Sequence, residues 1–205
     1  MSQTFALSAE PRTNTGKGSA RRSRKHNIIP GTIYGGDKQP QNINVSLFAL
    51  VKQLENDGIF SHIIELTVAG EKESVILKGM QRHPAKELPI HVDFQRVDQK
   101  REITVHVPVH FLNEKLCAGV KAGGILSHQM TDLELTCLPK DLPEAIEIDV
   151  TDLALGAAIH VSEIKLPSGV KSVILMHGQD PSIVTVVPPT VEKAPTEEAP
   201  KTEES

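Results

Sequence analysis

Basic residues gather near the start of the chain, in a segment bordered by glycine. Lys17, Arg21, Arg22, Arg24 and Lys25 fall within nine residues, with no acidic residue among them. A glycine-bordered basic loop that leads into a strand suits a backbone that must approach phosphates closely. Arginine adds a flat, always charged donor fork that matches phosphate oxygens and base edges. The segment therefore predicts an anionic partner, and the alternative is an ordinary solvated loop.

A second group of residues that could take part in catalysis or binding lies between positions 83 and 93. His91 and Asp93 share one face of an expected strand, and His83 is close in sequence. The group could form a metal or acid–base site, an RNA-facing set of hydrogen-bonding groups, or an ordinary polar strand face. The sequence contains no HExxH, GxSxG, Walker-type or GxGxxG pattern, and neither a third ligand nor a nucleophile with its base is apparent. We therefore expect a protein that is not an enzyme and has no metal or cofactor.

The other histidines and the two cysteines form no ligand pattern. Five histidines are scattered through the second half of the chain without regular spacing. Cys117 and Cys137 lie 20 residues apart without a CxxC motif, which argues against a zinc site. Buried free thiols are the simpler expectation, and a disulfide remains an open alternative.

The distribution of charge divides the chain of 205 residues into two halves. Residues 1–100 carry 14 Lys+Arg and 10 Asp+Glu, a net charge of +4, whereas residues 101–205 carry 8 and 16, a net charge of −8. This asymmetry predicts two units with different partners and places an anionic partner on the first. There is no apolar run of about 18 residues and no secretory pattern at the N-terminus, so we expect a cytoplasmic protein without membrane contact.

The elements that must position these residues are mostly short strands. Alternating apolar residues predict strands at 4–9, 42–45, 63–68, 73–80 and 90–96. Pro30 and Gly31 predict a bend or bulge in an edge strand. One clear helix is expected over residues 46–57, with Ser46 as its N-cap and Gly58 as its stop.

The second half has the pattern of an all-β module. Apolar residues alternate with polar ones at 103–109, 133–137 and 146–150, and a further apolar strand is expected at 183–187. Turn residues between these strands favour a sandwich-like or barrel-like module. From about Val191 the chain is rich in Pro, Thr, Glu and Lys, which predicts a disordered acidic tail.

Five blocks of sequence are informative when taken together. The first half contains GKGSARRSRKHNIIPGTIYGG and QRHPAKELPIHVDFQRV. The second half contains GVKAGGILSHQM, LTCLPKDLPEAIEIDVTDLALGAAIHVSEIKLPSGV and IVTVVPP. In this order the blocks resemble the bacterial large-subunit ribosomal protein family that binds 5S rRNA, in its long, two-domain form, also called general stress protein CTC. The resemblance covers residues 3–189.

The resemblance implies a mainly β fold in three parts. Residues 1–96 would form a small β-barrel with helices that binds 5S rRNA, residues 97–189 an all-β domain, and residues 190–205 a disordered acidic tail. The protein would be a monomeric constituent of the ribosome, bound to the loop E region of 5S rRNA near the central protuberance. 23S rRNA and neighbouring ribosomal proteins would be further contacts. An irregular loop is a sensible target, because regular A-form RNA hides its major groove.

The resemblance also implies which residues contact the RNA. The basic loop, one aromatic side chain, the QRHP segment and the polar strand face supply them: Lys17, Arg21, Arg22, Arg24, Tyr34, Gln81, Arg82, His83, His91 and Asp93. Ala20 stands where some family members have Ser, so a hydroxyl contact is absent there.

Two other classes of function stay open at this point. A stress-related, chaperone-like module would bind proteins through residues 97–189 without RNA. A hydrolase or metal enzyme centred on His83, His91 and Asp93 would require bound metal or turnover.

Overall fold

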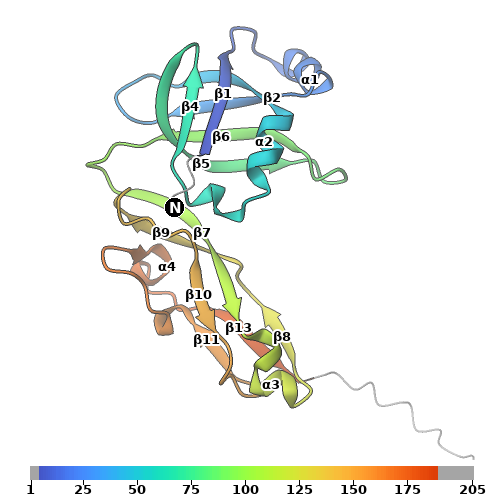
Figure 1. Cartoon of the computed structure of the whole chain (residues 1–205), viewed down its shortest axis with the longest axis vertical. Helices are drawn as coiled ribbons and strands as arrows, with labels where there is room; N and C mark the ends of the chain where they lie inside the picture. Colours follow the sequence, from blue (N-terminus) through green and yellow to red (C-terminus); the bar gives the residue numbers. More distant parts are fainter. Residues whose placement is uncertain (1–4, 189–205) are drawn as a thin grey trace, which may run out of the picture.

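The first half of the protein is a closed β-barrel with short helices. The computed structural model describes residues 5–188, and Figure 1 shows the barrel above an elongated second β-region. The barrel strands follow the order β1-β3-β2-β6-β5-β4, and parallel pairing of β1 with β4 closes the ring. These strands are β1 (Phe5–Pro11), β2 (Ile28–Tyr34), β3 (Gln41–Ser46), β4 (Ile64–Val68), β5 (Glu71–Arg82) and β6 (Pro89–Arg96).

Alternation of apolar and polar residues builds the barrel interior. Successive side chains of a strand point to opposite faces, so every second residue enters the core. Val92 and Phe94 of β6 are fully buried, whereas Asp93 between them faces outward. Strict alternation over the predicted strand 90–96 would place Ile90 in the same buried row. Ile90 is only partly buried, because the β5–β6 register shifts there and leaves Ile90 as an extra residue on β6.

The strand that contains Pro30 and Gly31 lies inside the sheet, so the prediction of an edge strand is wrong. β2 pairs with β3 over residues 28–33 and with β6 from Gly31 to Tyr34. Pro30 precedes the first β2–β6 pair, so its missing N–H falls outside that ladder. At Gly31 a Cβ atom would lie only 2.8 Å from the backbone oxygen of Val92, which explains the glycine.

The basic segment is a helix, α1 (Lys17–Lys25), so the prediction of a basic loop is also wrong. Apart from Gly18, its residues are Lys, Arg, Ala and Ser, which tolerate or favour helical backbone. Basic residues in the last turn, Arg22, Arg24 and Lys25, also complement the partial negative charge at the C-terminal end of the helix.

The one helix that the sequence predicts is confirmed but is shorter than expected. α2 (Leu47–Leu54) begins directly after Ser46, and its Leu50 is fully buried. The residues around Gly58 form a separate 3-10 helix, η1 (Asp57–Phe60), instead of ending α2.

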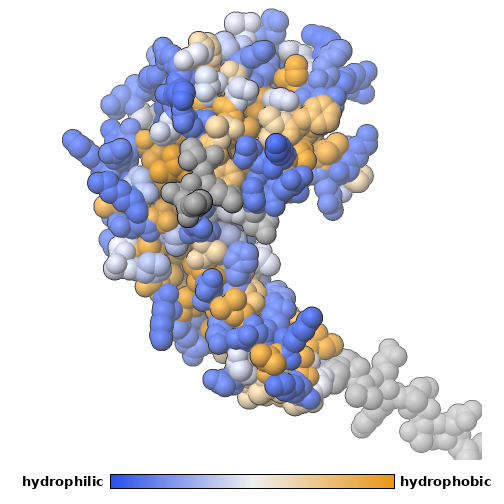
Figure 2. Space-filling model, in the orientation of Figure 1, coloured by the Kyte–Doolittle hydropathy of each residue, from blue (hydrophilic) through white to orange (hydrophobic). Residues whose placement is uncertain are grey.

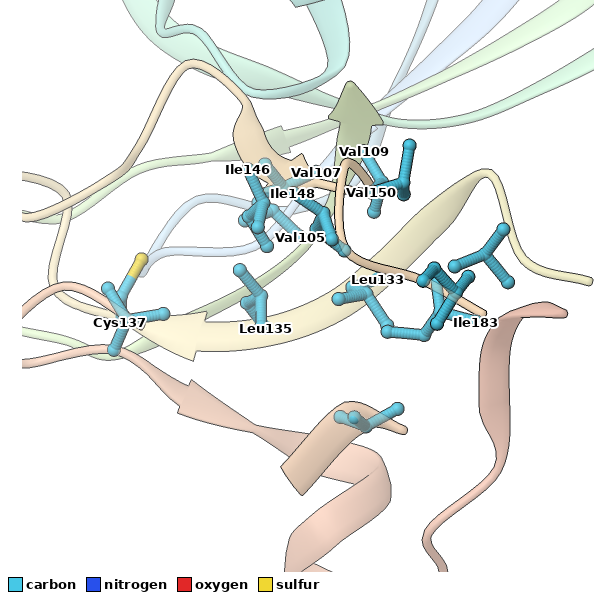
Figure 3. Packing of buried hydrophobic residues seen from close by; sticks show 14 of the residues in the cluster. Val105, Val107, Val109, Leu133, Leu135, Cys137, Ile146, Ile148, Val150 and Ile183 are labelled. Carbon is cyan, nitrogen blue, oxygen red and sulfur yellow. The ribbon is translucent and has the colours of Figure 1, made fainter. Parts of the chain in front are cut away.

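The C-terminal β-domain consists of two sheets that enclose one core. The sheets have the orders β10-β7-β9-β12 and β11-β13-β8. Figure 3 shows how side chains from β7, β9, β10 and β13 meet in this core. The strands are β7 (Ile103–Leu112), β8 (Ile125–His128), β9 (Asp132–Cys137), β10 (Ile146–Asp149), β11 (Ala158–His160), β12 (Lys171–Ser172) and β13 (Ser182–Val187). Short helical segments connect them: η2 (Glu114–Leu116), α3 (Ala118–Lys121), η3 (Val161–Glu163) and α4 (Val173–Met176).

The mainly β prediction is therefore confirmed for both regions. Cys117 and Cys137 are buried free thiols, as expected. The thiol of Cys117 donates a hydrogen bond of 3.3 Å to the Leu153 carbonyl oxygen. The predicted acidic tail, residues 190–205, lies outside the described residues. No helix within residues 5–188 has the length and apolar character needed to cross a membrane.

One mostly buried carboxylate ties β5 to the segment between β2 and β3. Glu73 accepts hydrogen bonds from Lys38 Nζ at 2.6 Å and from Arg96 Nε at 2.9 Å. Arg96 also donates to the carbonyl oxygens of Gly35 and Gln39. Burial alone would raise the pKa of Glu73, but the hydrogen bonds from Lys38 and Arg96 outweigh it and lower the pKa below its ordinary value.

Glu73→Gln should lower the free energy of unfolding by about 1–3 kcal/mol at neutral pH, because two cations lose a charged acceptor. The pKa of Glu73 is lower in the folded state, so its stabilising contribution is complete above the unfolded value near 4.5 and is lost as the pH falls through the folded value. Urea unfolding of both proteins over a pH series measures this. The difference between wild type and variant should shrink below pH 4.5; a constant difference would contradict the assignment.

Candidate nucleic-acid interface

Helix α1 carries positive charge that the rest of the described chain does not neutralise. It has no acidic residue in its first turn and no buried side chain. Within residues 5–188, none of its basic side chains forms an ion pair with an acidic group: Lys17, Arg21, Arg22, Arg24 and Lys25. Figure 2 shows hydrophilic side chains over this region, at the upper right of the barrel. The helix therefore presents free cations to the surroundings.

Arg24 fastens α1 to the barrel. Its Nε donates a hydrogen bond of 2.9 Å to the carbonyl oxygen of Ile90, directly before His91 on β6. Near the other end of α1, Ser19 Oγ donates to the carbonyl oxygen of Asn14 at 3.0 Å. Arg24 uses one of its five N–H donors in this way and keeps the others for a partner. The bond places the cations of α1 beside the polar face of β6.

The outer faces of β2, β6 and β5 form one polar surface. In the strand register, Asp93 lies between Thr32 on β2 and Gly79 on β5. His91 pairs with Gln81 of β5 on the same face. We call this surface the polar face, and its members are Thr32, Tyr34, Gly79, Gln81, His91, Asp93 and Gln95.

Asp93 lies near two other polar groups of this face, His91 and Tyr34. His91 Nδ1 lies 3.5 Å from Asp93 Oδ1, within ion-pair distance but without a hydrogen bond. Burial, followed by the negative charge of Asp93, raises the pKa of Tyr34 above its ordinary value of 10.0. Tyr34 therefore keeps its proton at neutral pH and can donate a hydrogen bond, while Asp93 can only accept one.

The remaining predicted residues lie at the end of β5 and in the hairpin that follows. Gln81, Arg82 and His83 are all exposed. His83 Nδ1 accepts hydrogen bonds from the backbone N–H groups of Ala85 and Lys86, at 3.2 and 3.3 Å. His83 thus shapes the hairpin turn, and its other ring nitrogen is left for an outside partner.

The fold brings together two groups that are far apart in sequence, α1 and the polar face. It does not join His83 to His91 and Asp93 in a metal centre: within residues 5–188, no cluster of three or more His, Cys, Asp or Glu side chains could hold a metal ion.

The sequence-based site omitted three members of the polar face. Thr32 and Gln95 could have been found from alternation, since each is two residues from a predicted contact. Gly79 lies opposite Asp93 only because β5 contains a bulge, which no local pattern reveals.

Comparison with known proteins agrees with both halves of the structure. Residues 7–94 match the Ribosomal L25p family, and residues 102–190 match the C-terminal domain of ribosomal protein TL5. Large ribosomal subunit protein bL25 of Pseudomonas aeruginosa (strain LESB58) is 47% identical over 184 residues, which cover 89% of this chain and 90% of that protein. The chain belongs to the bL25 family. The bL25 protein of Pseudomonas savastanoi pv. phaseolicola (strain 1448A / Race 6) is 50% identical over 195 residues, 95% of each chain.

Membership of the bL25 family settles the class of function. With both matched regions present, the protein is a long form of bL25 and a structural constituent of the large ribosomal subunit that acts in translation. It is not an enzyme, so the hydrolase alternative is set aside, and as a bacterial ribosomal protein it works in the cytoplasm. The resemblance noted in the sequence is confirmed at the level of the family.

The link between Asp93 and Tyr34 can be tested without RNA. The chain has one tyrosine and no tryptophan, so the absorbance of ionised tyrosine reports Tyr34 alone. Asp93→Asn should lower the pKa of Tyr34 toward its ordinary value, but not fully, because burial remains. An ultraviolet pH titration measures the shift, with Asp132→Asn in the C-terminal β-domain as the control. Equal titration curves for wild type and both variants would refute the link.

Proposed function

We propose that this bL25 family member binds the loop E region of 5S rRNA through α1 and the polar face. The observation that carries the proposal is the hydrogen bond from Arg24 to the Ile90 carbonyl oxygen. It holds a helix whose cations have no acidic partner within residues 5–188 next to a surface that offers Tyr34, His91 and Asp93. Large-subunit proteins that are about half identical over nearly the whole chain support an RNA partner within the ribosome.

The cations of α1 supply attraction in this proposal. Lys17, Arg21 and Arg22 are exposed and point to no acidic partner among the described residues, so phosphate oxygens can replace water around them. Each phosphate neutralised releases condensed counterions, which makes the affinity depend strongly on salt. Arg24 combines this role with its anchoring bond to β6.

The polar face supplies selectivity. A carboxylate such as Asp93 is repelled by phosphate, so its place beside α1 fits a base edge that donates a hydrogen bond. Tyr34 can donate through its hydroxyl group or stack, and His91 and Gln81 add further hydrogen-bonding groups. Distorted RNA with a widened minor groove would expose such base edges, whereas a regular duplex would not. Arg82 and His83 at the hairpin extend the contact.

The proposal assigns the RNA contact to a domain of residues 1–96. The domain of residues 97–189 and the tail of residues 190–205 stay off the phosphate backbone, because residues 101–205 have a net charge of −8. The protein acts as a monomer, with neighbouring ribosomal proteins and 23S rRNA as further contacts.

The first test is binding of the full-length chain to an RNA fragment that contains loop E, over a salt series. A regular RNA duplex of equal length is the control. We expect a clear preference for the fragment and an affinity that falls as salt rises. Equal, weak binding to both RNAs would leave only a general basic patch and would overturn the loop E assignment.

Arg21→Ala separates base recognition from phosphate contact. If Arg21 reads a base edge, the variant should lose about 1–3 kcal/mol of binding free energy and some of its preference for the fragment. If it contacts phosphate only, the loss should be similar on both RNAs and the salt slope should become smaller. Lys140→Ala removes one exposed cation outside the interface and should bind as the wild type does. Wild-type binding by Arg21→Ala would remove α1 from the site.

A further inference from the structure

Strand β5 belongs to two hydrophobic cores at once. Val75 and Leu77 point into the barrel, where they are 0% and 2% exposed. Ile76, between them, points outward and is fully buried in the core of the C-terminal β-domain. The barrel wall at this position is therefore also part of the second core.

Two residues after Ile76 on β5, Lys78 adds polar interactions with the C-terminal β-domain. The β5–β6 register shifts between Leu77 and Gly79, so Lys78 is the extra residue of a β-bulge. Its Nζ donates to the Thr104 carbonyl oxygen on β7 at 2.9 Å and lies 3.7 Å from Glu134 Oε1 on β9. The cation therefore interacts with the C-terminal β-domain.

The bulge decides which side chains of β5 reach the polar face. If β5 alternated strictly through Lys78, with no bulge, Met80 would face outward and Gln81 would face the barrel core. With the bulge, Met80 packs against the core, and Gly79 and Gln81 lie opposite Asp93 and His91. A Cβ atom at Gly79 would be 3.8 Å from Asp93 Oδ2, which shows how near the bulge is to the proposed RNA contacts.

A second set of polar contacts joins the barrel to the C-terminal β-domain at Glu144. Ser61, after η1, is 2% exposed, and its Oγ lies 2.7 Å from the Glu144 carbonyl oxygen, to which it donates. His62 Nε2 lies 3.3 Å from Glu144 Oε1. The apolar contact of Ile76 is thus accompanied by two sets of polar contacts, one through Lys78 and one through Ser61 and His62.

We propose that the C-terminal β-domain acts as a brace for the RNA-binding face, with Lys78 as the positioning residue. By holding Lys78 in the bulge, the domain keeps Gly79 and Gln81 in register with Asp93 and His91. The domain then contributes to RNA affinity without contacting the RNA. This inference rests on the proposed binding of loop E by the polar face.

The test is Lys78→Met in the full-length chain. Loss of the hydrogen bond to Thr104 should weaken binding to the loop E fragment by roughly 2- to 30-fold. This is the range of change in affinity expected when a substitution alters the coupling between two distant sites. Without RNA, the backbone amides of Gly79 and Gln81 should exchange hydrogen faster than in the wild type, because the bulge is less firmly held. Lys78→Arg keeps a charged donor and should restore both properties in large part.

The chain offers a matched control on the same strand. Lys72→Met removes the same group from β5, but Lys72 pairs with Glu65 on β4, within the barrel. It should leave the affinity and the exchange at Gly79 and Gln81 unchanged. Glu134→Gln removes the other partner of Lys78 and should shift both measurements in the same direction by a smaller factor.

The outcomes distinguish the brace from the proposed function. Unchanged exchange and unchanged affinity in Lys78→Met would overturn the brace. Lost affinity with unchanged exchange would also overturn it, because Lys78 would then act by contacting RNA. If the wild type does not prefer loop E, the proposed function fails, and the exchange measurement without RNA still decides whether Lys78 holds the bulge.

Discussion

The pairing of β5 with β6 is the constraint on which the rest of the molecule depends. Each strand carries one extra residue, Lys78 on β5 and Ile90 on β6. These two residues break the alternation that would otherwise fix every side chain to one face. Between them, His91 and Asp93 face outward beside Gln81. Both extra residues are held by neighbours: Lys78 donates to β7, and the Ile90 carbonyl oxygen accepts from Arg24.

The charge on α1 has a cost in helix stability that no ion pair within residues 5–188 offsets. Cations three or four residues apart share a helix face, and such like-charged pairs destabilise an isolated helix by about 0.2–0.5 kcal/mol each. Lys17 and Arg21 form one such pair, and Arg21 and Lys25 another. A helix of nine residues is also too short to be stable in water by itself. The hydrogen bond from Arg24 to the Ile90 carbonyl oxygen attaches the helix to the barrel, and an anionic partner would relieve the repulsion.

Local patterns in the sequence predicted most strands, because alternation follows directly from strand geometry. The buried positions of β7 and β9 are examples. The helix after Ser46 was predicted in the same local way, from the helical spacing of its apolar residues. Errors arose where tertiary pairing decides the outcome: β2 became an interior strand because β6 pairs with it, and Ile90 left the buried row because of a bulge. The glycines at the start of the basic segment favour a loop, but the Lys, Arg and Ala residues that follow favour helical backbone and prevail in α1. The RNA contacts themselves came from the family resemblance and stay predictions.

The bond between Arg24 and Ile90 also sets an order of assembly during synthesis. Arg24 leaves the ribosome 66 residues before Ile90, whose carbonyl oxygen it contacts. β1 must likewise wait for β4, since Phe5 pairs with Ile64. Such long-range contacts fold slowly, and domains made on the ribosome fold as units. A nascent chain therefore displays its positive charge well before it can display a shaped surface. The proposed selectivity for RNA structure would therefore have to wait until β6 has been made.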